Sequence, residues 1–184
     1  SGADMLVYGM GEQPLRDIMK GVKEGYSLKD LTHIPQVAFL QSASDALPVV
    51  ETWETVELAS HEVCLEDKIK YASNFKIVEV ESNKWQANRI TQAVGDEILV
   101  INPPFKTMEE VEMDKSFDLP YTRLPHPKYD KRGPIPAFEM IKFSINIHRG
   151  CFGGCSFCTI SAHQGKFIAS RSQESVLKEI DKVA

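Results

Sequence analysis

Residues 140–158, MIKFSINIHRGCFGGCSFC, are the most informative stretch of this chain. Apolar and polar side chains alternate from residue 143 to residue 147, which predicts a β-strand over Met140–Ile147. Three cysteines follow, Cys151, Cys155 and Cys158, in the spacing CxxxCxxC. A loop this short can direct three thiolates at one [4Fe–4S] cube and leave the fourth iron without a protein ligand. The stretch therefore predicts a strand that ends in a metal-binding loop.

The residues after the cysteines predict a helix that completes this unit. Ser172 is of a type favoured at a helix N-cap, and apolar residues recur at helical spacing from Val176 onward. Lys178 and Glu179 fall on the side of this helix that we expect to face solvent. Strand, cysteine loop and helix form one β/α unit, and active sites of parallel α/β barrels lie at the carboxyl ends of the strands. The predicted fold class is therefore α/β.

Four residues around the cysteines are candidates for contact with a cofactor. Gly153 and Gly154, like Gly150 before the first cysteine, allow positive φ angles and let backbone N–H groups approach the sulfurs. Phe157 would shield one face of the cube, and Arg149 would tune its charge. The simpler interpretations of the same residues are an ordinary turn and a phenylalanine that packs in the core.

Two other kinds of metal protein stay open at this point. A structural zinc site would need a fourth ligand, which His148 or His163 can supply. An electron-transfer module would need a fourth cysteine, and Cys64 is the one cysteine left in the sequence. Cys64 lies in a helical pattern that begins at Ser60, where we expect it to be a small buried apolar residue.

The cysteine loop resembles the radical SAM signature, because an aromatic residue directly precedes the last cysteine of the CxxxCxxC spacing. Over nearly its whole length the chain resembles the YgiQ-like family of uncharacterised radical SAM proteins. The matching segments are residues 4–12 (DMLVYGMGE), 102–104 (NPP), 119–127 (LPYTRLPHP), 135–141 (IPAFEMI), 149–158, 163–165 (HQG) and 170–172 (SRS).

This resemblance implies a cobalamin-binding-like α/β region followed by a radical SAM barrel. It also implies that Cys151, Cys155 and Cys158 hold a [4Fe–4S] cluster whose open iron binds S-adenosylmethionine, to yield a 5′-deoxyadenosyl radical. An electron donor such as flavodoxin or ferredoxin would reduce the cluster, and the substrate is not identified. We expect a radical SAM enzyme and assign no further catalytic residue within this chain.

The expected organisation has four segments. They are residues 1–50, the end of the cobalamin-binding-like region; 51–102, a helix and β-hairpin module; 103–137, a proline-rich connector; and 138–184, the start of the barrel. Patterning predicts strands at Met5–Tyr8 and Val37–Leu40, a helix that ends near Gly25, and a hairpin of Trp85–Ala93 and Asp96–Ile101. The first βα unit is expected to be Rossmann-like.

Polar residues of the connector and of the last segment are expected to order the chain rather than to react. Tyr121, Arg123, His126 and Tyr129 lie in a stretch that holds many of the prolines, where packing and hydrogen bonding are the favoured roles. Glu139 is expected to pair with Arg149 or Arg171.

Length and composition limit the possible functions. The chain has 184 residues, 42% of them hydrophobic, and a net charge of −5, so it can bury a core but has no basic surface for nucleic acid. No apolar run reaches the ~20 residues that span a bilayer, and reduced thiols fit a cytoplasmic location. The abrupt start at Ser1 and end at Ala184 indicate a fragment, too short to complete a catalytic cycle by itself.

Overall fold

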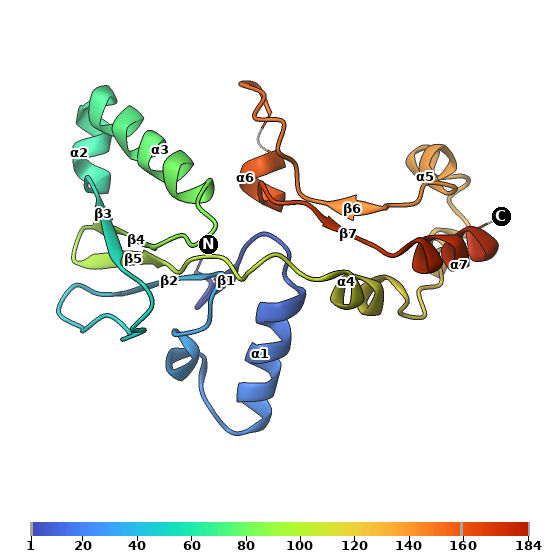
Figure 1. Ribbon diagram of the computed structural model, residues 1–184, viewed down its shortest axis with the longest axis horizontal. Coiled ribbons are helices and arrows are strands. Elements are labelled where there is room, and N and C mark those ends of the chain that lie inside the picture. The colour runs from blue at the N-terminus through green and yellow to red at the C-terminus, as the bar shows by residue number, and fades with distance from the viewer. Residues whose placement is uncertain (1, 159, 184) are drawn as a thin grey trace. The chain divides into compact units, whose positions relative to one another are not determined.

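The computed structural model describes residues 2–158 and 160–183, without the side chains of residues 162 and 163. The chain forms two compact units (Figure 1). The first unit contains Ser1–Lys106 and Cys151–Lys166, and the second contains Thr107–Gly150 and Phe167–Ala184. The predicted segments 1–50 and 51–102 therefore belong to one unit, and the predicted last segment is divided between the two.

A five-stranded sheet forms the centre of the first unit. Its strands are β1 (Leu6–Val7), β2 (Val37–Ser42), β3 (Thr55–Leu58), β4 (Arg89–Val94) and β5 (Glu97–Ile101), in the order β1-β2-β5-β4-β3. Only the β3–β4 pair is parallel among the pairs that the structure describes. The predicted α/β class is confirmed. The connection from β1 to β2 contains a helix, and the two strands pair antiparallel. The first βα segment, expected to be Rossmann-like, is therefore not a parallel crossover.

Local sequence signals account for the helices of this unit. They are α1 (Glu12–Lys23), the 3-10 turn η1 (Leu28–Leu31), α2 (His61–Glu66), α3 (Lys68–Ser82) and α6 (Ile160–Gln164). The single helix expected after Ser60 is interrupted at Asp67, whose carboxylate accepts hydrogen bonds from the backbone N–H groups of Ile69 and Lys70. Asp67 thus ends α2 and caps α3, which the apolar pattern alone does not show.

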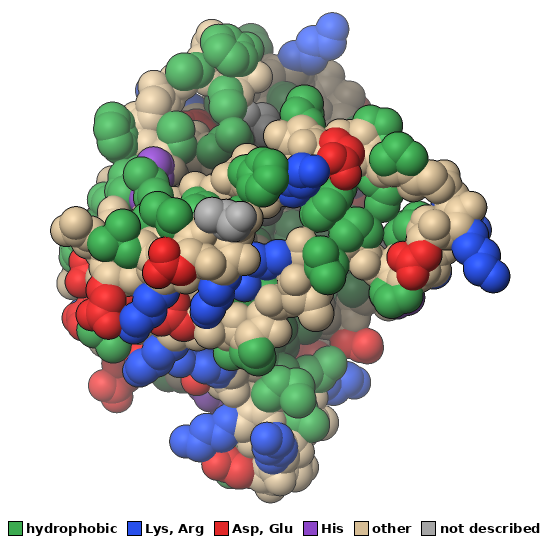
Figure 2. All heavy atoms as spheres, turned by 90° about the vertical axis from the view of Figure 1, so that its right-hand side faces the viewer, with side chains coloured by type: hydrophobic (Ala, Val, Ile, Leu, Met, Phe, Trp, Pro, Cys, Tyr) green, Lys and Arg blue, Asp and Glu red, His purple; other side chains and the backbone are tan. Residues whose placement is uncertain are grey.

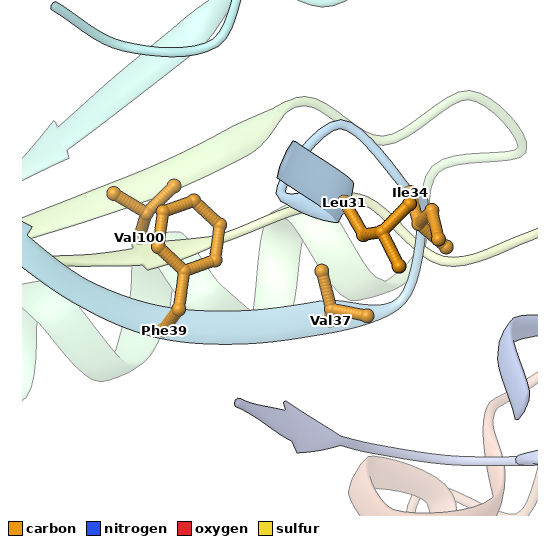
Figure 3. Packing of buried hydrophobic residues seen from close by; sticks show 5 residues of the cluster. All are labelled: Leu31, Ile34, Val37, Phe39 and Val100. Carbon is orange, nitrogen blue, oxygen red and sulfur yellow. The ribbon is translucent and has the colours of Figure 1, made fainter. Parts of the chain in front are cut away.

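The core of the first unit lies on one face of the sheet. Val37 and Phe39 of β2 and Val100 of β5 are buried with Leu31 and Ile34, as Figure 3 shows. The apolar run that predicts a buried strand at Val37–Leu40 is confirmed, and so is the hairpin, which turns at Gly95 with a φ of 57°.

A buried polar network closes one end of this core. The side-chain amide of Asn102 is fully buried and donates to the carbonyl oxygens of Thr32 and Ile34, at 2.8 and 2.7 Å. The Tyr8 hydroxyl donates to the Asn102 carbonyl oxygen at 2.5 Å, and burial raises the pKa of that hydroxyl above its ordinary value. These bonds satisfy backbone groups that the sheet does not pair.

The second unit has less regular structure. Its elements are α4 (Glu110–Phe117), the 3-10 turn η2 (Pro127–Tyr129), α5 (Pro136–Ile141), β6 (His148–Arg149), β7 (Ala169–Ser170) and α7 (Gln173–Val183). The strands β6 and β7 pair antiparallel. The predicted N-cap of the last helix is confirmed, because the Ser172 hydroxyl accepts from the Ser175 backbone N–H at 3.0 Å.

The strand predicted over Met140–Ile147 is wrong. Pro136 occupies the first turn of α5, where its missing N–H costs nothing, and the helix continues to Ile141. The chain then turns, with the Ser144 N–H donating to the Ile141 carbonyl oxygen. In the described part of the chain, the strand in this region is His148–Arg149, and it pairs with β7.

An ion-pair cluster holds the second unit together. Arg171, whose side chain is fully buried, pairs with Glu179 of α7, and Glu179 also pairs with Arg123 at 3.0 Å. Glu179 is therefore not the solvated residue that we expected. The predicted partner of Glu139 is also wrong, because Glu139 pairs with Lys142 three residues on. The guanidinium of Arg171 lies 4.4 Å from the ring centre of Phe117.

Apolar side chains also lie at the surface. Figure 2 views the molecule from the side where α5 and α7 lie in Figure 1, and hydrophobic side chains are spread across it. The exposed residues of this kind in and around α5 and α7 are Met140, Ile141, Phe143, Ile147, Leu177 and Ile180. Within the described residues, no helix is long and apolar enough to cross a membrane.

Candidate functional site

The cysteine loop is closed at its base by contacts of its own unit. The backbone N–H of Cys151 donates to the carbonyl oxygen of Gly165 at 2.9 Å, which joins the two ends of the loop. The next residue, Lys166, forms an ion pair with Glu79 of α3 at 2.6 Å, and its side chain is largely buried. The loop is thereby attached to the helix that covers the sheet.

Two of the three cysteine sulfurs lie around one glycine. A β-carbon added to Gly153 would lie 3.4 Å from Cys151 Sγ and 3.7 Å from Cys155 Sγ. The Cys158 backbone N–H donates to the Cys155 carbonyl oxygen at 3.0 Å, so the last two cysteines lie on one turn. All three cysteines are free thiols. The type, number and spacing of these donors fit an iron–sulfur cluster with one open iron.

The three sulfurs do not form a closed ligand set in this conformation. No group of three or more His, Cys, Asp or Glu side chains is positioned to hold a metal ion within the described residues. Cys155 is exposed, and Cys151 and Cys158 are half-buried. Binding a cluster therefore requires the turn at Cys155 and Cys158 to adjust around Gly153.

The other predicted site residues have defined surroundings. Gly154 has a φ of 58°, so it uses the backbone freedom for which it was singled out, whereas Gly153 does not have a positive φ. Phe157 is 89% exposed and thus does not pack in a core. The Arg149 guanidinium lies 5.0 Å from the ring centre of Phe117, within the second unit.

The residues proposed as a fourth ligand receive no support. Cys64 Sγ accepts a hydrogen bond from the Asn74 side-chain amide at 3.0 Å, which makes Cys64 part of the packing between α2 and α3. His148 is an exposed residue of β6. The His163 side chain lies outside the described residues.

Two residues that matter for the loop were not predicted as such, namely Glu79 and Lys166, which form the ion pair at its base. The positive φ expected at Gly150, which precedes the loop, is confirmed at 93°. A β-carbon on Gly150 would lie 2.2 Å from the Phe167 carbonyl oxygen, so no other residue fits there without movement. The alternation of glycines with cysteines signals Gly150, but residues 79 and 166 are too far apart in sequence for any local pattern to pair them.

Comparison with known proteins relates the chain to one group. Residues 1–144 match the family described as Radical SAM N-terminal, a range that ends before the cysteines. A UPF0313 protein of Bacteroides thetaiotaomicron is 53% identical, over 100% of this chain and 31% of the relative. A UPF0313 protein of Porphyromonas gingivalis is 55% identical, over 100% of this chain and 28% of the relative.

A more distant relative follows the same pattern. A UPF0313 protein of Geobacter sulfurreducens is 41% identical, over 99% of this chain and 29% of its own length. The chain thus spans less than a third of each of these relatives. No solved structure gives a significant match.

Proposed function

This chain belongs to the Radical SAM N-terminal family, and from that membership we propose that it contributes the cluster-binding loop of a radical SAM enzyme. The observation that carries the proposal is the arrangement of Cys151 and Cys155 around Gly153, with Cys158 on the adjoining turn. A [4Fe–4S] cluster held by these three cysteines and reduced by one electron from a donor would supply, with S-adenosylmethionine, methionine and a 5′-deoxyadenosyl radical that takes hydrogen from the substrate. The whole protein's substrate and product are not assigned.

In this proposal, residues of the chain bind the cluster and fix the ends of the cysteine loop. Cys151, Cys155 and Cys158 lose their thiol protons on binding, because the thiolate is the form that ligates metal. Gly153 leaves the space between two sulfurs free of a side chain. The Cys151–Gly165 hydrogen bond and the Lys166–Glu79 ion pair fix the ends of the loop, so that ordering three thiolates costs less conformational entropy.

The exposed aromatic side chain beside the last cysteine has a role in this proposal. We propose that Phe157, which is exposed in this structure, covers the bound cofactor and excludes water from it, which would strengthen electrostatic interactions at the site. Arg149 as a charge that tunes the cluster stays a prediction. An electron donor of the flavodoxin or ferredoxin class is proposed as the reductant, and a cytoplasmic location is proposed with it.

Anaerobic reconstitution with iron and sulfide tests the ligand set. We expect the full chain to bind four iron and four sulfide ions, and single alanine variants of Cys151, Cys155 and Cys158 each to lose most of them. The matched control is Cys64→Ala, which removes a cysteine from the same unit and should keep the full iron content. Iron lost in Cys64→Ala would favour the electron-transfer module, and stoichiometric zinc without iron would favour the structural zinc site. Either result contradicts the proposal.

A further inference from the structure

Arg89 is a buried cation with no acidic partner in the part of the chain that the structure describes. It is the first residue of β4 and only 4% exposed. Its Nε donates to the Asn102 side-chain oxygen at 3.1 Å and its Nη1 donates to the Pro48 carbonyl oxygen at 2.7 Å. Both acceptors are neutral. Within the described residues, its Nη2 has no hydrogen-bond partner at all.

Burial of the Arg89 charge without a counter-charge destabilises the folded state. A charged group removed from water loses several kcal/mol of hydration, and proteins usually offset that loss with an opposite charge. Burial lowers the pKa of the Arg89 guanidinium, and no neighbouring charge acts against that shift. The ring of Trp53, 5.1 Å from the guanidinium carbon, offers a weaker cation–π attraction. The buried charge thus lacks a counter-charge, in contrast to Arg171, which has Glu179.

The surroundings of Arg89 define where a counter-charge would bind. The Asn102 side-chain oxygen accepts from Nε and the Pro48 carbonyl oxygen accepts from Nη1, while the guanidinium lies over the ring of Trp53. The remaining donor, Nη2, is buried without a partner. Pro48 and Trp53, which contact the same guanidinium, belong to residues 43–54, a connection from β2 to β3 that contains neither helix nor strand. Val49 in this connection is 90% exposed. Arginine binds carboxylate and phosphate oxygens well because its N–H groups match their spacing.

We propose that Arg89 is the centre of an anion site that takes a compact oxyanion, a carboxylate or phosphate group of a small molecule, beside residues 43–54. The oxyanion accepts from Nη2 and shares Nη1 with, or displaces, the Pro48 carbonyl oxygen. Because Nη2 is buried, the connection moves outward to admit the ligand and closes again over the neutralised charge. The site does not depend on the cysteine loop or on its cluster.

Hydrogen–deuterium exchange of the full chain tests the site directly. Sodium phosphate and sodium acetate are titrated separately, with sodium chloride at matched ionic strength as the control for screening. We expect amide exchange in residues 43–54 to slow and saturate with one or both oxyanions and not with chloride. Saturation by phosphate alone assigns a phosphate group, and saturation by acetate alone assigns a carboxylate. No saturable response to either overturns the proposal.

Variants separate a binding site from a structural arginine. Arg89→Met removes the charge at similar volume and should abolish the response, whereas Arg132→Met, which removes an exposed cation, should retain it. Without added oxyanion, Arg89→Met should melt at the same or a higher temperature, because an unpaired buried charge has been removed. A response that survives in Arg89→Met overturns the proposal. The proposal is also overturned if Arg89→Met melts at a much lower temperature than wild type and neither phosphate nor acetate raises the melting temperature of wild type. Should Arg89→Met fail to fold, Arg89→Lys keeps the charge without the planar fork and should weaken half-saturation by about tenfold or more.

Discussion

In the first unit Val37, Phe39 and Val100 are buried against one another across β2 and β5, whereas in the second unit the buried centre of α7 is polar. There Ser175 is almost completely buried and accepts from Arg171, while the apolar Leu177 and Ile180 of the same helix are exposed. The first unit thus has a contiguous apolar core, whereas the second unit buries Met108 and Met113 and also contains a hydrogen-bonded ion cluster of Arg171, Glu179 and Arg123.

This difference determines which substitutions matter in each unit. A core of packed apolar side chains responds to lost volume, because the cavity left behind is filled only in part. A buried ion cluster responds to lost charge, because the remaining partner is left without compensation. The two units should therefore differ in their sensitivity to truncation, to charge removal and to pH.

The largest effect is expected from Phe39→Ala in the first unit. Phe39 is 6% exposed, and its truncation should lower the free energy of unfolding by about 4 kcal/mol. Leu40→Ala on the next residue is the matched control, since Leu40 is 52% exposed and should cost under about 1 kcal/mol. Urea unfolding followed by circular dichroism measures both. Equal losses would contradict the account of an apolar core on one face of the sheet.

Glu179→Gln should have the next largest effect, in the second unit. The substitution keeps the shape but removes the charge that compensates the fully buried Arg171, which should cost about 3 kcal/mol. Glu174→Gln is the control on the same helix, because the Glu174–Lys178 pair is exposed to solvent and contributes little to stability. Amide exchange of α7 gives the local readout. Similar exchange in both variants would mean that the ion cluster does not stabilise α7.

A third, smaller effect comes from the backbone. Gly150→Ala places a β-carbon 2.2 Å from the Phe167 carbonyl oxygen and should cost about 2 kcal/mol. Gly165→Ala has a similar positive φ of 88° but open space around the β-carbon, and should cost about 1 kcal/mol. Thermal unfolding of the two variants compares them. An equal cost would show that the close approach to Phe167 is not part of the folded state.

The smallest effect is a graded dependence on pH. Burial alone would raise the pKa of Glu179, but hydrogen bonds from Arg171 and Arg123 outweigh it and hold that pKa below its ordinary value. Such a carboxylate stabilises the folded state above its unfolded pKa, near 4.5, and the contribution is lost as the pH falls through the folded value. The protection factors of α7 amides, which correct the exchange rates for the intrinsic pH dependence of exchange, should therefore fall below about pH 4.5 in wild type and change less in Glu179→Gln. Equal slopes would contradict this assignment.

Patterns that act over a few residues predicted the first unit well. The apolar run at Val37–Leu40 and the alternation on both sides of Gly95 correspond to β2 and to the β4–β5 hairpin. The Ser172 cap of the second unit was also predicted, because a cap is a local hydrogen bond. The helical pattern predicted to begin at Ser60 does begin there. What the patterns could not show is that the hairpin joins β2 in one sheet, since that pairing is between distant residues.

Prediction failed where local signals competed. Met140–Ile147 alternates like a strand, but Pro136 begins a helix just before it and no long strand pairs with it among the described residues. Glu139 forms its ion pair with Lys142, three residues away, and not with the expected Arg149 or Arg171. At the candidate site the cysteine ligand set, which comes from the spacing alone, stays a prediction, whereas the Glu79–Lys166 ion pair is seen only in the folded chain.

The proposed function requires that the cysteine loop of the first unit hold a [4Fe–4S] cluster with one iron left open for S-adenosylmethionine. Electron paramagnetic resonance of the reduced, anaerobically reconstituted full chain can be recorded with and without S-adenosylmethionine. We expect a [4Fe–4S] signal whose g values shift when S-adenosylmethionine is added and which is absent in Cys155→Ala. A cluster signal in the full chain that S-adenosylmethionine leaves unchanged would contradict the open iron, and with it the proposed function.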